Sequence, residues 1–140
     1  MLAGFGEDHG LPRHQAIALG RCLGGGMGQG LVCGAVSGAL LILGLLPPGE
    51  PQDETRCRQE ALMRGAQFRE EFSRRRGSLL CRDLLGVDIS TPEGRRQAVE
   101  QEMFSKLCPA LVGEAAAILE EVLSEGAEAT PQRPAAETTR

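Results

Sequence analysis

The feature that most constrains this chain is an uncharged segment, residues 22–49, with the sequence CLGGGMGQGLVCGAVSGALLILGLLPPG. Its second part, residues 31–46, is an unbroken run of uncharged, mostly apolar residues. A membrane-spanning helix needs about 20 predominantly apolar residues, and the glycines before this run add little hydrophobicity. We therefore expect a buried helix that ends at the Pro-Pro-Gly sequence of residues 47–49, and no membrane span.

The glycines of this segment fit neither common phosphate-binding pattern, because G-x-G-x-x-G is absent and no lysine follows them. Gly26, Gly30, Gly34 and Gly38 instead recur every four residues. This spacing brings the last three close to one face of a helix, beside Cys33. Each glycine in a helix costs about 1 kcal/mol relative to alanine, so we expect another helix or a ligand to approach closely. The alternative is that the glycines only allow tight helix crossing and Cys33 is a small buried hydrophobe.

Helical signals occupy most of the remaining chain, and no segment has a convincing strand pattern. The sequence predicts an all-α fold, a compact bundle of five to seven helices with a glycine-rich helix entry, over residues 1–125. Residues 126–140 lack an apolar pattern and are predicted to be a disordered tail. The expected helices cover residues 2–9, 12–23, 31–46, 53–77, 78–86, 90–104 and 109–126.

Three of these helices carry an apolar stripe that should face the core. In the helix that starts near residue 12, the expected stripe is Ile17, Ala18 and Cys22. In the long helix over residues 53–77 it is Cys57, Ala61, Gly65, Phe68 and Phe72. In the last helix it is Leu111, Ala115, Ile118, Val122 and Leu123.

Charge and composition exclude several functional classes. The net charge is −4, and the basic residues are scattered except for Arg74–Arg76, so no stripe could follow a nucleic-acid backbone. We interpret Arg74–Arg76 as a solvated helix end and His9 and His14 as surface residues. The first residues are acidic where a signal peptide would be basic and then apolar, so we expect a cytoplasmic protein.

The five cysteines have no C-x-x-C spacing, and their odd number leaves at least one unpaired in any intramolecular scheme. In a reducing compartment they are expected to be free thiols, reactive thiols or metal ligands. Cys57 lies on the stripe of the long helix and is interpreted as a core residue. For Cys22, core and site roles both stay open.

Three cysteines are expected at helix starts, where free backbone N–H groups lower the pKa of a thiol. Cys108 precedes Pro109 and should cap the last helix. Cys81 should lie in the first turn of a short helix capped by Ser78, and Cys33 near the start of the apolar helix. The shared position predicts a common thiol site.

Three stretches carry a resemblance to a known family: residues 24–45 with the core CGAVSG, residues 68–86 with Cys81, and residues 107–123 with Cys108. They resemble the C_GCAxxG_C_C family of redox-active proteins, to which the split-Soret cytochromes are distantly similar. The resemblance implies a helical domain in which four cysteines act together. In the family the first cysteine lies on a helix ahead of the segment MLAGFGEDHGLP, so Cys22 is the candidate substitute here.

Three functions follow as hypotheses. The first is a thiol–disulfide oxidoreductase that uses Cys33, Cys81 and Cys108 with a redox partner protein. The second is an iron–sulfur or metal-binding protein in which Cys22, a partner chain or the family's first cysteine completes the ligand set. The third is a non-catalytic helical module that forms a homodimer through its glycine face.

Overall fold

The computed structural model describes residues 1–45 and 53–128, and within them the chain forms seven α-helices. The predicted all-α fold is confirmed. The disordered tail was predicted from residue 126, but α7 continues to Glu128; the rest of that tail and the turn at residues 47–49 lie outside the described residues. The α-helices are α1 (Leu2–Phe5), α2 (Arg13–Gly20), α3 (Gly34–Leu45), α4 (Glu54–Arg76), α5 (Cys81–Leu85), α6 (Pro92–Glu100) and α7 (Met103–Glu128). A 3-10 turn, η1 (Glu7–His9), and a π-type turn, η2 (Gly26–Gly30), complete the assignment.

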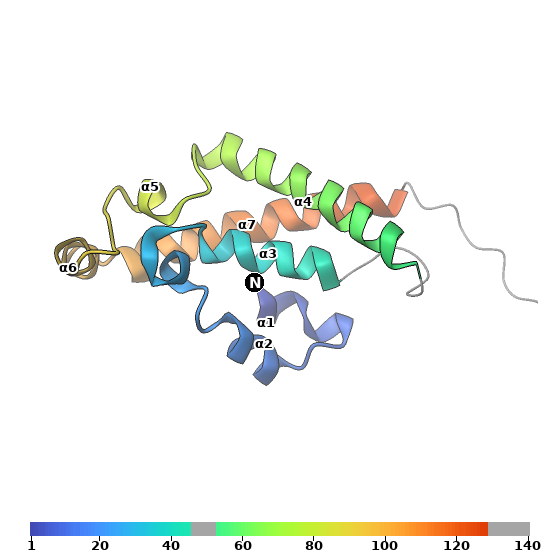
Figure 1. The fold of residues 1–140 in the computed structure, drawn as a ribbon, viewed down its shortest axis with the longest axis horizontal. Helices are drawn as coiled ribbons and strands as arrows, with labels where there is room; N and C mark the ends of the chain where they lie inside the picture. Colours follow the sequence, from blue (N-terminus) through green and yellow to red (C-terminus); the bar gives the residue numbers. More distant parts are fainter. Residues whose placement is uncertain (46–52, 129–140) are drawn as a thin grey trace, which may run out of the picture.

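The long helices α3, α4 and α7 contact one another and form the body of the molecule. Figure 1 shows α1 and α2 alongside α3, with α5 and α6 at one end. The core between the long helices includes the fully buried Ile42, Phe68, Phe72 and Ile118. The two phenylalanine rings of α4 stack with their centroids 6.0 Å apart. The chain has no Trp or Tyr, so these rings carry most of its aromatic core.

Helix α4 forms as its sequence predicts. The Asp53 side chain accepts a hydrogen bond from the Arg56 N–H at 3.0 Å, and Gly77 ends the helix at φ +81°. The predicted stripe is buried at Cys57, Gly65, Phe68 and Phe72, and Ala61 is half-buried.

The three arginines at the end of α4 are more than a solvated helix end. Arg75 binds Glu114 at 3.1 Å and Glu121 at 2.6 Å, both on α7. Arg76 also binds Glu114, at 2.8 Å. The run therefore joins α4 to α7, a role that only the packing of the two helices reveals.

The regular glycine spacing is only partly helical in the structure. Gly34 and Gly38 lie on α3, whereas Gly30 belongs to η2 and has φ +66°. A Cβ at Gly34 would lie 2.7 Å from the carbonyl oxygen of Leu23, and a Cβ at Gly38 would lie 2.9 Å from the Cβ of Met1. The expected close approach is therefore real, and this chain's own N-terminal segments make it. The face proposed for dimerisation is occupied within the chain.

The start of α7 is the largest departure from the predicted helices. The helix begins at Met103, so Cys108 is not its cap and Pro109 lies inside it. The predicted helix over residues 90–104 ends instead at Glu100, and Glu102 takes φ +53° between α6 and α7. Met103 and Leu107 pack against the cluster formed by α5, α6 and the loop between them. The free energy gained by burying these two side chains offsets the loss of the backbone hydrogen bond that Pro109 cannot donate.

The predicted face of α2 is wrong. Ala16 is buried, whereas Ile17 is 46% exposed and Ala18 and Cys22 are exposed. The neighbouring α1 is too short to cover a wide apolar face, so only the small Ala16 reaches the core cluster. Both histidines are exposed, as predicted. Among the helices of the described residues, none has the length and apolar content to span a bilayer.

Candidate functional site

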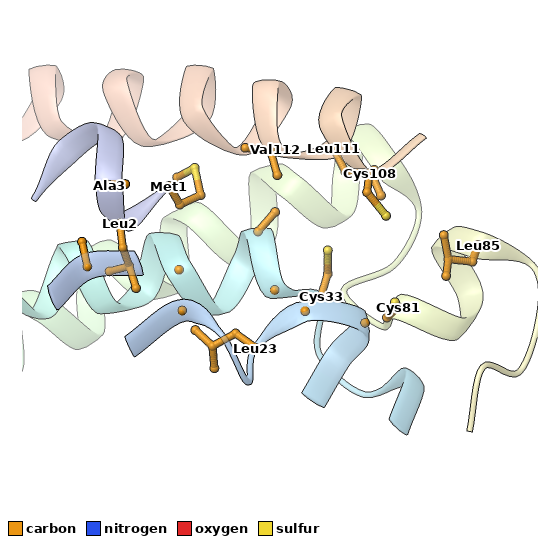
Figure 2. Close-up of a pocket in the computed structure, with 17 residues that line it drawn as sticks. Met1, Leu2, Ala3, Leu23, Cys33, Cys81, Leu85, Cys108, Leu111 and Val112 are labelled. Carbon is orange, nitrogen blue, oxygen red and sulfur yellow. The ribbon is translucent and has the colours of Figure 1, made fainter. Parts of the chain in front are cut away.

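Cys33, Cys81 and Cys108 line one cavity of about 300 Å³ (Figure 2). They come from the residue before α3, the first residue of α5, and the sixth residue of α7. The predicted convergence of these residues is therefore present. Cys22 is exposed and does not line the cavity, and Cys57 is buried on α4 outside it.

A single antiparallel bridge between Val32 and Leu80 positions two of the thiols. The Cys33 N–H donates to the Leu79 carbonyl at 2.9 Å, and the Cys81 N–H donates to the Leu31 carbonyl at 2.6 Å. These two bonds flank the bridge, which makes it a non-hydrogen-bonded pair with Cys33 and Cys81 diagonally opposed on one face. The backbone thus fixes both cysteines on the same side.

The position of Cys33 follows from the glycine segment before it. Gly26 has φ +58°, and a Cβ there would lie 2.5 Å from the backbone of Leu31. Only glycine fits this tight loop, which returns the chain to the bridge. Cys33 lies near the start of α3, as predicted, although the helix begins at Gly34 and not at Leu31; the Cys33 carbonyl accepts the Ser37 N–H at 2.9 Å.

The predicted Ser78 cap of α5 is wrong, because Leu80 occupies the N-cap position. The Ser78 hydroxyl accepts the Leu80 N–H at 3.0 Å and donates to Asp83 at 2.7 Å. The Cys81 side chain is 4% exposed and belongs to the cluster with Leu85. Helix α5 is one turn of five residues, and the N–H of Cys81 is already bonded in the bridge.

The predicted lowering of the pKa is wrong for Cys81 and Cys108. Burial, together with the nearby Cys33 and Cys108, raises the pKa of Cys81 to about 11. Burial and the nearby Cys33 raise the pKa of Cys108 above its ordinary value. Cys108 lies inside α7, so the free N–H groups of a helix start are not available to it, and no basic side chain lines the cavity. Both Cys81 and Cys108 therefore ionise less readily than an ordinary cysteine.

The rest of the cavity wall could be predicted only in part. Leu111 was expected on the inner stripe of α7, and it lines the cavity beside Val112 and Leu85. Leu2 of α1 has no signal that predicts this role, and Ala16 and Gly20 of α2 are not predicted because the apolar pattern of that helix indicates Ile17. Within residues 1–45 and 53–128, no group of three or more His, Cys, Asp or Glu side chains is arranged to hold a metal ion.

Comparison with known proteins identifies the family of the chain. The family model described as "Putative redox-active protein (C_GCAxxG_C_C)" matches residues 1–122. No curated protein matches the chain, and no solved structure does so either. The matched residues include all of the cavity lining and all three of its cysteines. The chain belongs to the C_GCAxxG_C_C family of redox-active proteins.

Proposed function

We propose that this protein is a dithiol–disulfide redox protein whose working pair is Cys33 and Cys108. One observation carries the proposal: three thiols from distant parts of the sequence line the same cavity. A reducing cytoplasm, which the sequence favours, would keep them reduced between encounters with a partner protein.

Cys108 is the thiol that a partner protein can reach first. Its side chain is half-buried, whereas Cys33 is 7% exposed and Cys81 is 4% exposed. Cys108 loses its proton, and the resulting thiolate attacks a disulfide of the partner, forms a mixed disulfide and releases one partner thiolate. Cys33 then attacks the sulfur of Cys108 and releases the second partner thiolate. Two electrons pass to the partner, and the two thiol protons go to its two thiolates.

Cys33 pairs better with Cys108 than with Cys81. Diagonal residues in an antiparallel pair lie about 7–8 Å apart, whereas a disulfide needs Cα atoms about 4.4–6.8 Å apart. A Cys33–Cys81 disulfide would therefore require the Val32–Leu80 bridge to open. In Figure 2 the Cys33 and Cys108 thiols point toward one another, the first from just before α3 and the second from α7.

Mild oxidation followed by peptide mapping tests the proposal. The reduced, folded protein is treated with the neutral oxidant diamide, the remaining thiols are alkylated, and the disulfide-linked peptides are identified by mass spectrometry. We expect a Cys33–Cys108 link that persists in Cys22→Ser and is lost in Cys33→Ser. A chain whose three cavity thiols all stay free would overturn the function, and a Cys33–Cys81 link would overturn the proposed pairing.

A further inference from the structure

The cavity wall contains no charged or amide side chain, so its three thiols are its most reactive groups. The other lining residues are small or apolar, and they come from α1, α2, the glycine segment, α3, α5 and α7. Beside the thiols, the wall is formed by Met1, Leu2, Ala3, Ala16, Gly20, Leu23, Gly24, Gly25, Gly34, Ala35, Gly38, Leu85, Leu111 and Val112.

This wall selects its occupant by charge. A carboxylate or phosphate entering the cavity would lose its water without meeting a cationic side chain, and a charge left unpaired in such a place is strongly unfavourable. The transfer of a neutral, mainly apolar molecule from water into the cavity has no such desolvation cost, and the hydrophobic effect favours it. Charged redox molecules are therefore poor ligands for this cavity.

The size of the cavity sets a second limit. An apolar protein cavity of about 150 Å³ binds benzene, and this one measures about 300 Å³. A single substituted ring or a fused pair of rings would fill it, whereas a protein segment would not. Cys33 and Cys81 are nearly inaccessible from outside, so a reactant that meets them directly must enter the cavity.

The three thiols determine which chemical property a reactant in the cavity must have. A molecule that takes two electrons and two protons from a dithiol, and is uncharged both before and after, satisfies the wall and the thiols together. Quinones have this property, because the oxidised quinone and the reduced hydroquinone are both neutral.

We propose that the cavity binds a small neutral quinone, which accepts two electrons from the cavity thiols. This inference rests on the proposed function, because it uses the same Cys33–Cys108 pair. Two S–H bonds break and one S–S bond forms, while both protons and both electrons pass to the quinone oxygens and give the hydroquinone. The protein disulfide then returns to the dithiol by exchange at Cys108.

Tetramethyl-1,4-benzoquinone is a suitable probe, because its ring has no unsubstituted carbon at which a thiol could add irreversibly. The reduced protein is mixed with it without oxygen, and hydroquinone formation is followed by absorbance. We expect one hydroquinone and one Cys33–Cys108 disulfide per chain, with a rate that saturates as quinone increases. A matched ring that carries one carboxylate side chain should react at least tenfold more slowly.

Gly20→Leu places a side chain at the cavity wall with little local conflict, because a Cβ there meets only Leu2, at 3.8 Å. It should lower the quinone rate at least tenfold and change oxidation by diamide much less, because diamide can react first at the half-buried Cys108. Gly113→Leu is the matched control, since Gly113 lies outside the lining and its Cβ would meet nothing within 4 Å. Should Gly20→Leu not fold, 1,4-dimethoxytetramethylbenzene, which has the same ring and cannot accept electrons, should inhibit the unmodified protein competitively.

Three results would overturn the quinone site: a rate linear in quinone, equal rates for the neutral and charged rings, or no inhibition by the inert ring. If diamide still forms the Cys33–Cys108 disulfide in that case, only the quinone site fails. If neither oxidant forms a disulfide, the proposed function fails with it.

Discussion

The rate at which iodoacetamide alkylates Cys81 tests how strongly the cavity raises the pKa of this thiol. Only the thiolate reacts, so the rate follows the thiolate population. The cavity raises the pKa of Cys81 from 9.0 to about 11, and each pKa unit changes the thiolate population about tenfold below both values. At pH 8 the folded protein should therefore alkylate Cys81 at least about 100-fold more slowly than the unfolded chain does.

Timed alkylation, digestion and mass spectrometry measure this ratio for each cysteine. In the folded protein the Cys81 rate should keep rising about tenfold per pH unit from pH 8 to pH 10. In denaturant it should level off above pH 9. Cys22, which is exposed, should react at similar rates in both states and serves as the internal control. A folded Cys81 that reacts within tenfold of the unfolded rate at pH 8 would refute the reasoning.

Three further predictions concern the fold. Phe68→Ala removes a fully buried ring and should lower the free energy of unfolding by about 3–5 kcal/mol; a loss below 1 kcal/mol by denaturant titration would contradict the core assignment. Thr91→Ala removes the hydrogen bond that the Thr91 hydroxyl accepts from the Gly94 N–H at 3.1 Å and should cost about 1 kcal/mol, whereas Thr91→Ser should keep the cap; equal losses in both variants would exclude capping. Hydrogen bonds from Arg74 and Arg75 lower the pKa of Glu71 from 4.5 to about 2, so its stabilising effect exists above pH 4.5 and disappears as the pH falls through 2. The unfolding midpoints of Glu71→Gln and the unmodified protein should thus differ at pH 7 and converge near pH 2; a constant difference would refute the pairing.

Local sequence signals predicted α4 and the body of α3 well. Both have a strong apolar pattern, and α4 also has an Asp cap and a terminal glycine, so local preference and packing agree. Helix α7 shows the opposite case. Pro109 is a typical helix start, yet burial of Met103 and Leu107 extends the helix upstream of it. That energy comes from contacts with α5 and α6, which the local pattern does not contain.

The sequence predicts which cysteines form the site better than it predicts the pKa values of their thiols. The family resemblance and the positions near helix starts both indicated Cys33, Cys81 and Cys108, and all three line one cavity. The pKa values of Cys81 and Cys108 depend on how deeply neighbouring elements bury them, so the direction predicted for these two thiols is wrong. The Val32–Leu80 bridge, which sets the relation of Cys33 to Cys81, has no local sequence signal. The exposure of Cys22 likewise depends on how the chain leaves α2.

Redox titration tests most directly whether Cys33 and Cys108 form one couple. The protein is equilibrated without oxygen in mixtures of oxidised and reduced dithiothreitol, and free thiols are counted after acid quenching. We predict that two thiols are lost per chain in a single two-electron transition, with a tenfold change in the oxidised-to-reduced ratio per about 30 mV. The transition should persist in Cys81→Ser and disappear in Cys33→Ser and Cys108→Ser. A transition that survives in Cys33→Ser, or no loss of thiols in the unmodified protein, would contradict the proposed redox pair.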